Sequence, residues 1–143
     1  MTIVERKPAT TEARMLLKIA RRDRSTFDIL VAAPDAPDES ICFYAQQIVE
    51  KTMKAVLVSN SAVFRRTHDL LELARLMQSL NLPLPVIEDD LSRLNPCAVT
   101  LRYADADVVL TIGRDRVRPI VDRVQQWAEE LLDVSDEDEM SNS

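Results

Sequence analysis

The sequence predicts an all-α protein: an up-and-down bundle of about five helices with an irregular loop before the last one. Apolar residues recur at helical spacing in successive segments of the chain, which is the main signature of amphipathic helices. The 143 residues include a single glycine, whereas an all-β protein needs several glycines at its tight turns. Apolar residues make up 46% of the chain and charged residues 29%, a balance typical of folded domains.

Breaks in the apolar pattern define the helix boundaries. We expect helices over 11–31, 38–58, 68–80, 87–94 and 114–134. Pro34 and Pro37 end the first helix, because proline lacks a backbone N–H donor and its ring pushes the preceding residue towards extended backbone. Within 96–113, the segments 98–101 and 108–112 resemble short strands. We favour a helix end followed by an irregular loop, since neither flank offers a turn glycine.

Polar residues at two of these boundaries have the side chains that cap helices. Asp38 or Ser40 is expected to cap the second helix. Thr67 or Asp69 is expected to cap the third helix, and Asp69 followed by Glu72 has the spacing of a capping box.

The second predicted helix is apolar over more than half of its circumference. Such a helix lies either at the centre of its bundle or against a second subunit. In the second case Met53 and Phe43 would belong to a dimer interface. The remaining strip is narrow and polar, and consists of Gln46, Gln47, Glu50, Lys51 and Lys54.

Length and charge indicate one domain, spanning residues 1–134, followed by a disordered acidic tail at 135–143. The formal net charge is −6. Four of these negative charges belong to Asp136–Glu139, so the rest of the chain carries only −2. The acidity is therefore largely a property of the tail and does not exclude an anionic ligand. The arginines of the first and last helices are expected to lie on solvated faces.

The scarce residue types exclude several kinds of site. With Gly113 as the only glycine, neither a dinucleotide-binding turn nor a P-loop can form. His68 is the only histidine, and Cys42 and Cys97 are the only cysteines, so we expect no metal site and no cofactor. No apolar stretch approaches the ~20 residues of a membrane span. Two widely spaced cysteines suit a reducing compartment, and we expect a cytoplasmic protein.

The polar strip of the second helix has two interpretations. Gln47, Lys51 and Lys54 are spaced at i, i+4 and i+7, so they share one helix face. An amide and two ammonium groups there can hold a phosphate or a base edge. The alternative is a solvated strip stabilised by a weak Glu50–Lys54 ion pair.

Two further pairs of residues have a structural and a functional interpretation each. His68 and Asp69 either cap the third helix, with His68 packed as a polar bridge, or receive an anion beside Lys51 and Lys54 at a helix N-terminus. Arg102 and Tyr103 either contact a ligand, or Arg102 pairs with a carboxylate while Tyr103 covers the core.

Two motifs resemble the HEPN family, whose members are proposed to bind nucleotides. They are Ile41–Ala55 (ICFYAQQIVEKTMKA) and Phe64–Leu70 (FRRTHDL). Small members of the family carry Cys-Phe, then Gln-Gln-x-x-Glu-Lys-x-x-Lys-Ala, then Arg-Thr-His-Asp-Leu. Arg102-Tyr103-Ala104 matches a later Arg-Tyr-Pro motif without its proline. The resemblance implies a helical bundle that commonly pairs into dimers, often beside a minimal nucleotidyltransferase in a toxin–antitoxin-like pair.

Some HEPN proteins are metal-independent RNases that use an arginine followed a few residues later by a histidine. This signature is missing from the chain. Asp107, Val108 and Val109 stand where a histidine would follow Arg102. Ser61, Ala62 and Val63 stand where an arginine would precede His68.

The sequence therefore favours a non-catalytic HEPN-like homodimer that binds a nucleotide, a nucleotidyltransferase partner, or both. The nucleotide-binding candidates are Gln47, Lys51, Lys54, His68, Arg102 and Tyr103. One alternative is a divergent RNase in which folding brings Arg102 and His68 together as catalytic residues, although RNA is not the expected partner. Another is a dimeric interaction module without a ligand.

Overall fold

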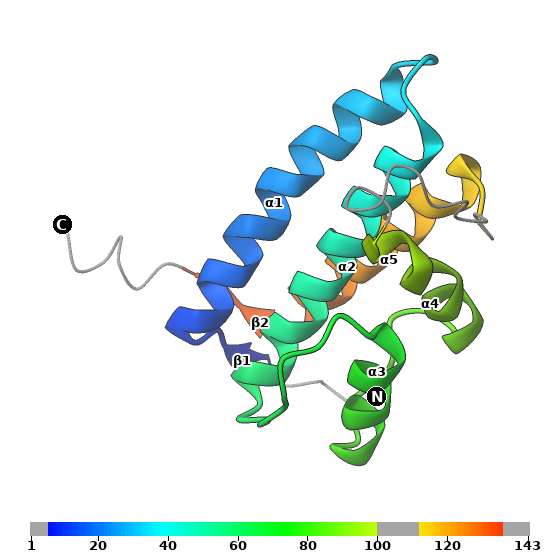
Figure 1. Ribbon diagram of the computed structural model, residues 1–143. Coiled ribbons are helices and arrows are strands. Elements are labelled where there is room, and N and C mark those ends of the chain that lie inside the picture. Colours follow the sequence, from blue (N-terminus) through cyan, green and yellow to red (C-terminus); the bar gives the residue numbers. More distant parts are fainter. Residues whose placement is uncertain (1–5, 100–111, 136–143) are drawn as a thin grey trace, which may run out of the picture.

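The computed structural model describes residues 6–99 and 112–135 and confirms the all-α class (Figure 1). The helices in this part of the chain are α1 (Thr11–Ala32), α2 (Asp38–Ser59), α3 (Leu70–Ser79), α4 (Glu88–Leu94), the 3₁₀ helix η1 (Asn95–Val99) and α5 (Arg114–Leu131). Two short strands, β1 (Lys7–Pro8) and β2 (Leu132–Asp133), pair in parallel.

Helix α2 is the centre of the bundle. Figure 1 shows α1 and α2 side by side and antiparallel, and α2 also contacts α3, α4, η1 and α5. Ile48, Met53 and Leu57 are fully buried. The apolar surplus of this helix is therefore used inside one chain, and the interpretation of Met53 as a dimer-interface residue was wrong. Phe43 is half-buried and packs edge-on against Tyr44.

Two arginines that were expected on solvated faces instead connect helices. The guanidinium of Arg24 in α1 lies 2.7 Å from a carboxylate oxygen of Asp122 in α5. Arg114, at the start of α5, donates to the carboxylate of Asp38 at 3.0 Å and to the carbonyl of Ala36 at 2.7 Å. These contacts hold α5 against the α1–α2 hairpin, and amphipathic periodicity does not reveal them because they join residues far apart in the sequence.

The ends of α2 and α5 differ from the predictions. Pro37 occupies the N-cap of α2 and no side chain caps this end, so neither Asp38 nor Ser40 has the capping role. Helix α5 ends at Leu131 instead of residue 134, because Leu132 and Asp133 pair with β1. A two-residue strand is too short to produce an alternating pattern, so the sequence did not reveal it.

The predicted start of the third helix was partly correct. Asp69 is the N-cap of α3 and accepts a hydrogen bond from the Leu71 amide at 2.9 Å. Glu72 does not complete a capping box, because its carboxylate accepts hydrogen bonds from Arg65 and Thr67.

The ambiguous segment is helical where the structure describes it. Ala98 and Val99 belong to η1, which is the favoured helix end rather than a strand. The expected loop falls largely on residues 100–111 and the expected acidic tail largely on 136–143, both outside the described residues.

Met53→Ala is expected to lower the free energy of unfolding by about 2–5 kcal/mol, because it opens a cavity at a fully buried position. Met15→Ala is the matched control, since the Met15 side chain is 63% exposed and its loss should change stability by less than about 0.5 kcal/mol. Urea unfolding of both variants measures the difference. A Met53→Ala protein of unchanged stability would contradict the central position of α2.

Candidate functional site

The site forms around one buried carboxylate, that of Glu50 on α2. The side chain is fully buried and its two oxygens accept four hydrogen bonds. Oε1 accepts from His68 Nδ1 at 2.8 Å and from Gln46 Nε2 at 3.1 Å. Oε2 accepts from Lys51 Nζ at 3.0 Å and from Lys54 Nζ at 3.1 Å. We call Gln46, Glu50, Lys51, Lys54 and His68 the Glu50 cluster.

Helical spacing brings most of this cluster together. Gln46, Glu50 and Lys54 follow one another at intervals of four residues, so their side chains stack along one line of α2. Lys51 follows Glu50 directly, and its long side chain turns back to reach the same carboxylate.

Gln46 connects α2 to the segment that carries His68. Its amide nitrogen donates to the His68 carbonyl at 3.2 Å as well as to Glu50. Its amide oxygen accepts from Gln47 Nε2 at 2.7 Å. Gln46 is fully buried, and a buried amide without partners would cost free energy. These bonds therefore hold the segment before α3 in one position over α2.

A second set of hydrogen bonds holds this segment from the other side. Asn95 accepts from the Leu70 amide at 2.9 Å and donates to the Asp69 carboxylate at 2.9 Å. The Thr67 hydroxyl accepts from the Asp69 amide at 3.0 Å. His68 thus lies in a segment bound to both α2 and the α4–η1 junction.

The surroundings of Glu50 favour its charged form. Burial by itself would raise the pKa of the carboxyl group. The hydrogen bonds from Lys51, Gln46 and His68, together with the charge of Lys51, outweigh burial and lower the pKa of Glu50 to about 2. The carboxylate is therefore ionised at neutral pH.

The hydrogen bond to Glu50 determines which nitrogen of His68 carries a proton. An ionised carboxylate can only accept hydrogen bonds, so Nδ1 must be the donor. In the neutral ring Nε2 is then a free acceptor, and in the imidazolium form it is a second donor. The His68 side chain is 53% exposed, so the imidazole can meet a molecule from solvent while its position is held by a buried partner.

The structure brings together some of the predicted site residues. Gln47, Lys51, Lys54 and His68 all lie in or beside the Glu50 cluster. Arg102 and Tyr103 lie outside the described residues. The Glu50–Lys54 ion pair is present at 3.1 Å, but it is buried rather than on a solvated strip.

The sequence pattern places Gln46 and Glu50 on a narrow polar strip and does not reveal their importance. The only sequence signal was the spacing of Gln46, Glu50 and Lys54, which follow one another at intervals of one helical turn. Such a line is equally typical of solvated helices. Only the segment that covers it, Thr67–Asp69, makes Gln46 and Glu50 interior residues.

In 6–99 and 112–135, no group of histidine, cysteine and acidic side chains is arranged to hold a metal ion. None of the helices in the same two ranges has the length and apolar character needed to cross a bilayer.

These features define a class: a helical bundle whose central helix carries a buried carboxylate beneath two lysines and a histidine. The HEPN domain family model matches residues 13–137. The chain therefore belongs to the HEPN family.

A solved structure is also similar to this chain. It is the crystal structure of TT1696 from Thermus thermophilus, with a TM-score of 0.58 and 23% sequence identity over 85% of this chain and 96% of that chain. At this identity the similarity supports the fold alone. No curated protein sequence matches the chain.

The low pKa of Glu50 predicts a loss of stability in acid. Because the pKa is lowered on folding, from 4.5 to about 2, the stabilisation is present above pH 4.5 and disappears as the pH falls from 4.5 to 2. Its size is about 3 kcal/mol. Urea unfolding at a series of pH values should show this acid limb in the natural protein and a flatter one in Glu50→Gln.

The control for this prediction is Glu72→Gln, which removes the partly exposed carboxylate paired with Arg65. Because water screens the charges of an exposed ion pair, it contributes little to stability, so this variant should keep both the acid limb and nearly all of its stability. Equal acid limbs in the natural protein and in Glu50→Gln would contradict the role assigned to Glu50.

Proposed function

We propose that the protein binds a nucleotide through its phosphate groups, at the surface formed by Lys51, Lys54 and His68, and does not cleave RNA. The observation that carries this proposal is that one buried carboxylate, Glu50, holds all three nitrogen-bearing side chains together. Binding sites gain affinity when their donors are positioned before the ligand arrives.

The lysines beside Glu50 keep donors that can bind an anion. Each lysine ammonium has three N–H donors and uses one of them on Glu50. Nearby, Asp23 adds a negative charge and Arg22 a positive one, and burial raises the pKa of Asp23 despite Arg22 and Lys51. Lys51, Lys54 and Arg22 balance Glu50, Asp23 and Asp69, and protonation of His68 adds a net positive charge.

RNA cleavage is the second candidate function. The specific observation that favours it is the 2.8 Å contact between His68 Nδ1 and Glu50. A carboxylate that orients an imidazole, with the other ring nitrogen free to accept a proton, is an arrangement suited to general-base catalysis. The sequence lacks the usual arginine–histidine spacing, and for that reason we place binding first.

The partner proposed for this protein is a minimal nucleotidyltransferase or a second copy of the chain. The outer side of α1 supports a role in association. Met15 and Ile29 lie two heptads apart, so they share one face of the helix, and they are 63% and 69% exposed.

Nucleotide binding should depend on the two lysines of the Glu50 cluster, Lys51 and Lys54. Lys54→Met removes one charge-assisted contact, each of which contributes about 1.5–3 kcal/mol, and is expected to weaken ATP binding at least about tenfold. Lys18→Met removes an exposed lysine of α1 and should leave binding unchanged. Isothermal titration with ATP, ADP and GTP, with and without Mg²⁺, measures the effect.

His68→Asn separates ligand contact from structural support. The asparagine amide can still donate to Glu50, whereas the outward-facing ring nitrogen is lost. We expect normal stability and weaker nucleotide binding. Unchanged affinity in both Lys54→Met and His68→Asn would place the nucleotide elsewhere, and the absence of binding by all three nucleotides would overturn the proposal.

The purified protein should leave transfer RNA and total RNA intact in the presence of EDTA, as followed by gel electrophoresis. Cleavage that disappears in His68→Asn would establish the second candidate function instead. Cleavage that persists in His68→Asn would exclude His68 as its base and, where it copurifies with the protein through a second column, would contradict the proposal that the protein does not cleave RNA.

A further inference from the structure

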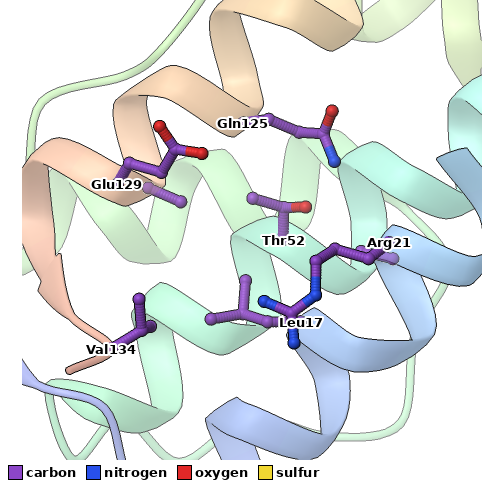
Figure 2. Close-up of a pocket in the computed structure, with 8 residues that line it drawn as sticks. Leu17, Arg21, Thr52, Gln125, Glu129 and Val134 are labelled. Atoms are coloured by element: carbon purple, nitrogen blue, oxygen red, sulfur yellow. The ribbon is translucent and has the colours of Figure 1, made fainter. Parts of the chain in front are cut away.

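A small cavity lies between α1, α2 and α5, on another side of α2 from the Glu50 cluster. Its volume is about 90 Å³. Figure 2 shows Thr52 of α2 at its centre, with residues of α1 and α5 on either side. The lining residues are Leu17, Ala20, Arg21, Thr52, Gln125, Ala128, Glu129 and Val134. The small side chains of Ala20 and Ala128 leave this space between α1 and α5 unfilled.

Thr52 places an unpartnered hydroxyl group in this cavity. The residue is 1% exposed, and its Oγ1 has no hydrogen-bond partner among the described residues. A threonine inside a helix often bonds to the carbonyl one turn before it, but Thr52 does not. Because a buried hydroxyl without a partner costs free energy, the position is best explained by a polar atom that enters from outside.

Gln125 offers a second donor from the opposite wall. Its Oε1 accepts from Arg24 at 2.8 Å, which fixes the amide so that the nitrogen is on the other side. Figure 2 shows the Thr52 hydroxyl directed towards this amide nitrogen. No hydrogen bond joins the two groups, and Gln125 Nε2 has no acceptor among the described residues. An oxygen atom between the two groups would accept from both.

Arg21 gives the cavity a positive charge. Its guanidinium has no ion pair or hydrogen bond within the described part of the chain, and Figure 2 shows it reaching back along Leu17 below Thr52. Glu129 lies at the other end of the opening and repels an anion there. The donors are thus concentrated at one end of the cavity, and the remaining walls are mostly alkyl.

We infer that this cavity binds a short-chain aliphatic monocarboxylate. The carboxylate accepts hydrogen bonds from Thr52 and Gln125 and faces the guanidinium of Arg21. The hydrocarbon chain packs against Leu17, Ala20 and Ala128. A volume of about 90 Å³ corresponds to about three water-sized groups, whereas benzene occupies an engineered cavity of about 150 Å³. The buried part of the ligand is therefore limited to about three water-sized groups, that is a carboxylate with one or two carbons of an unbranched chain, and it is not an aromatic ring.

This site is separate from the proposed nucleotide site. The residues that line the cavity include no member of the Glu50 cluster, and the volume is too small for a nucleobase.

Titration of the isotopically labelled full-length protein with sodium butyrate, followed by NMR, tests the inference. Saturable shifts of the Ala20, Thr52 and Ala128 signals are expected. Butylammonium, which has the opposite charge on a similar chain, should not produce them.

Thr52→Val keeps the shape of the side chain but removes the hydroxyl group. It should weaken butyrate binding about tenfold and, without ligand, raise the melting temperature by about 3 °C.

Two variants complete the test. Thr26→Val is the matched control, since Thr26 lies on α1 outside the cavity, and it should bind butyrate like the natural protein. Ala128→Leu fills the cavity and should abolish the shifts. The absence of saturable shifts, equal affinity in Thr52→Val, or equal binding of butylammonium would each overturn the inference.

Discussion

The negative charge of Glu50 is the feature on which the α2–α3 region depends. Removing a carboxylate from water carries a large desolvation penalty, which is compensated only when its oxygens are paired with well-placed donors. Here two ammonium groups, an imidazole and an amide satisfy both oxygens. The same hydrogen bonds that make burial of the charge tolerable also fix the positions of Lys51, Lys54 and His68, so the stability of the region and the geometry of the proposed site have one origin.

Helix α2 combines several roles because it is surrounded by other elements. Its apolar residues form much of the core, its polar strip carries the Glu50 cluster, and Thr52 reaches the space between α1 and α5. Arg24 connects α1 and α5 through Asp122, and a small cavity remains between these two helices and Thr52 of α2. A change of packing along α2 would therefore disturb more than one surface of the protein.

The placement of His68 explains how the single histidine of the chain can serve either binding or catalysis. The bond to Glu50 fixes the ring and its tautomer, while the exposed side of the ring remains open. An imidazole held in this way needs little reorganisation when a ligand arrives. Whether the imidazole contacts a phosphate or removes a proton depends on the group that lies opposite the ring. The arginine–histidine spacing used by RNases of the family is missing from this sequence.

Local periodicity was enough to determine the all-α class, the order of the helices and the shared face of Gln47, Lys51 and Lys54, because these follow from the 3.6-residue repeat of a helix. The N-cap role of Asp69 was likewise readable from neighbouring residues. The tertiary structure decided what depends on contacts between distant segments: the burial of Gln46 and Glu50, the Arg24 and Arg114 bridges, the β1–β2 pair and the cavity at Thr52. A polar strip on a helix has the same sequence pattern whether water or another segment covers it. Here the segment before α3 covers part of the strip, and this turned an expected solvated surface into a buried charged cluster.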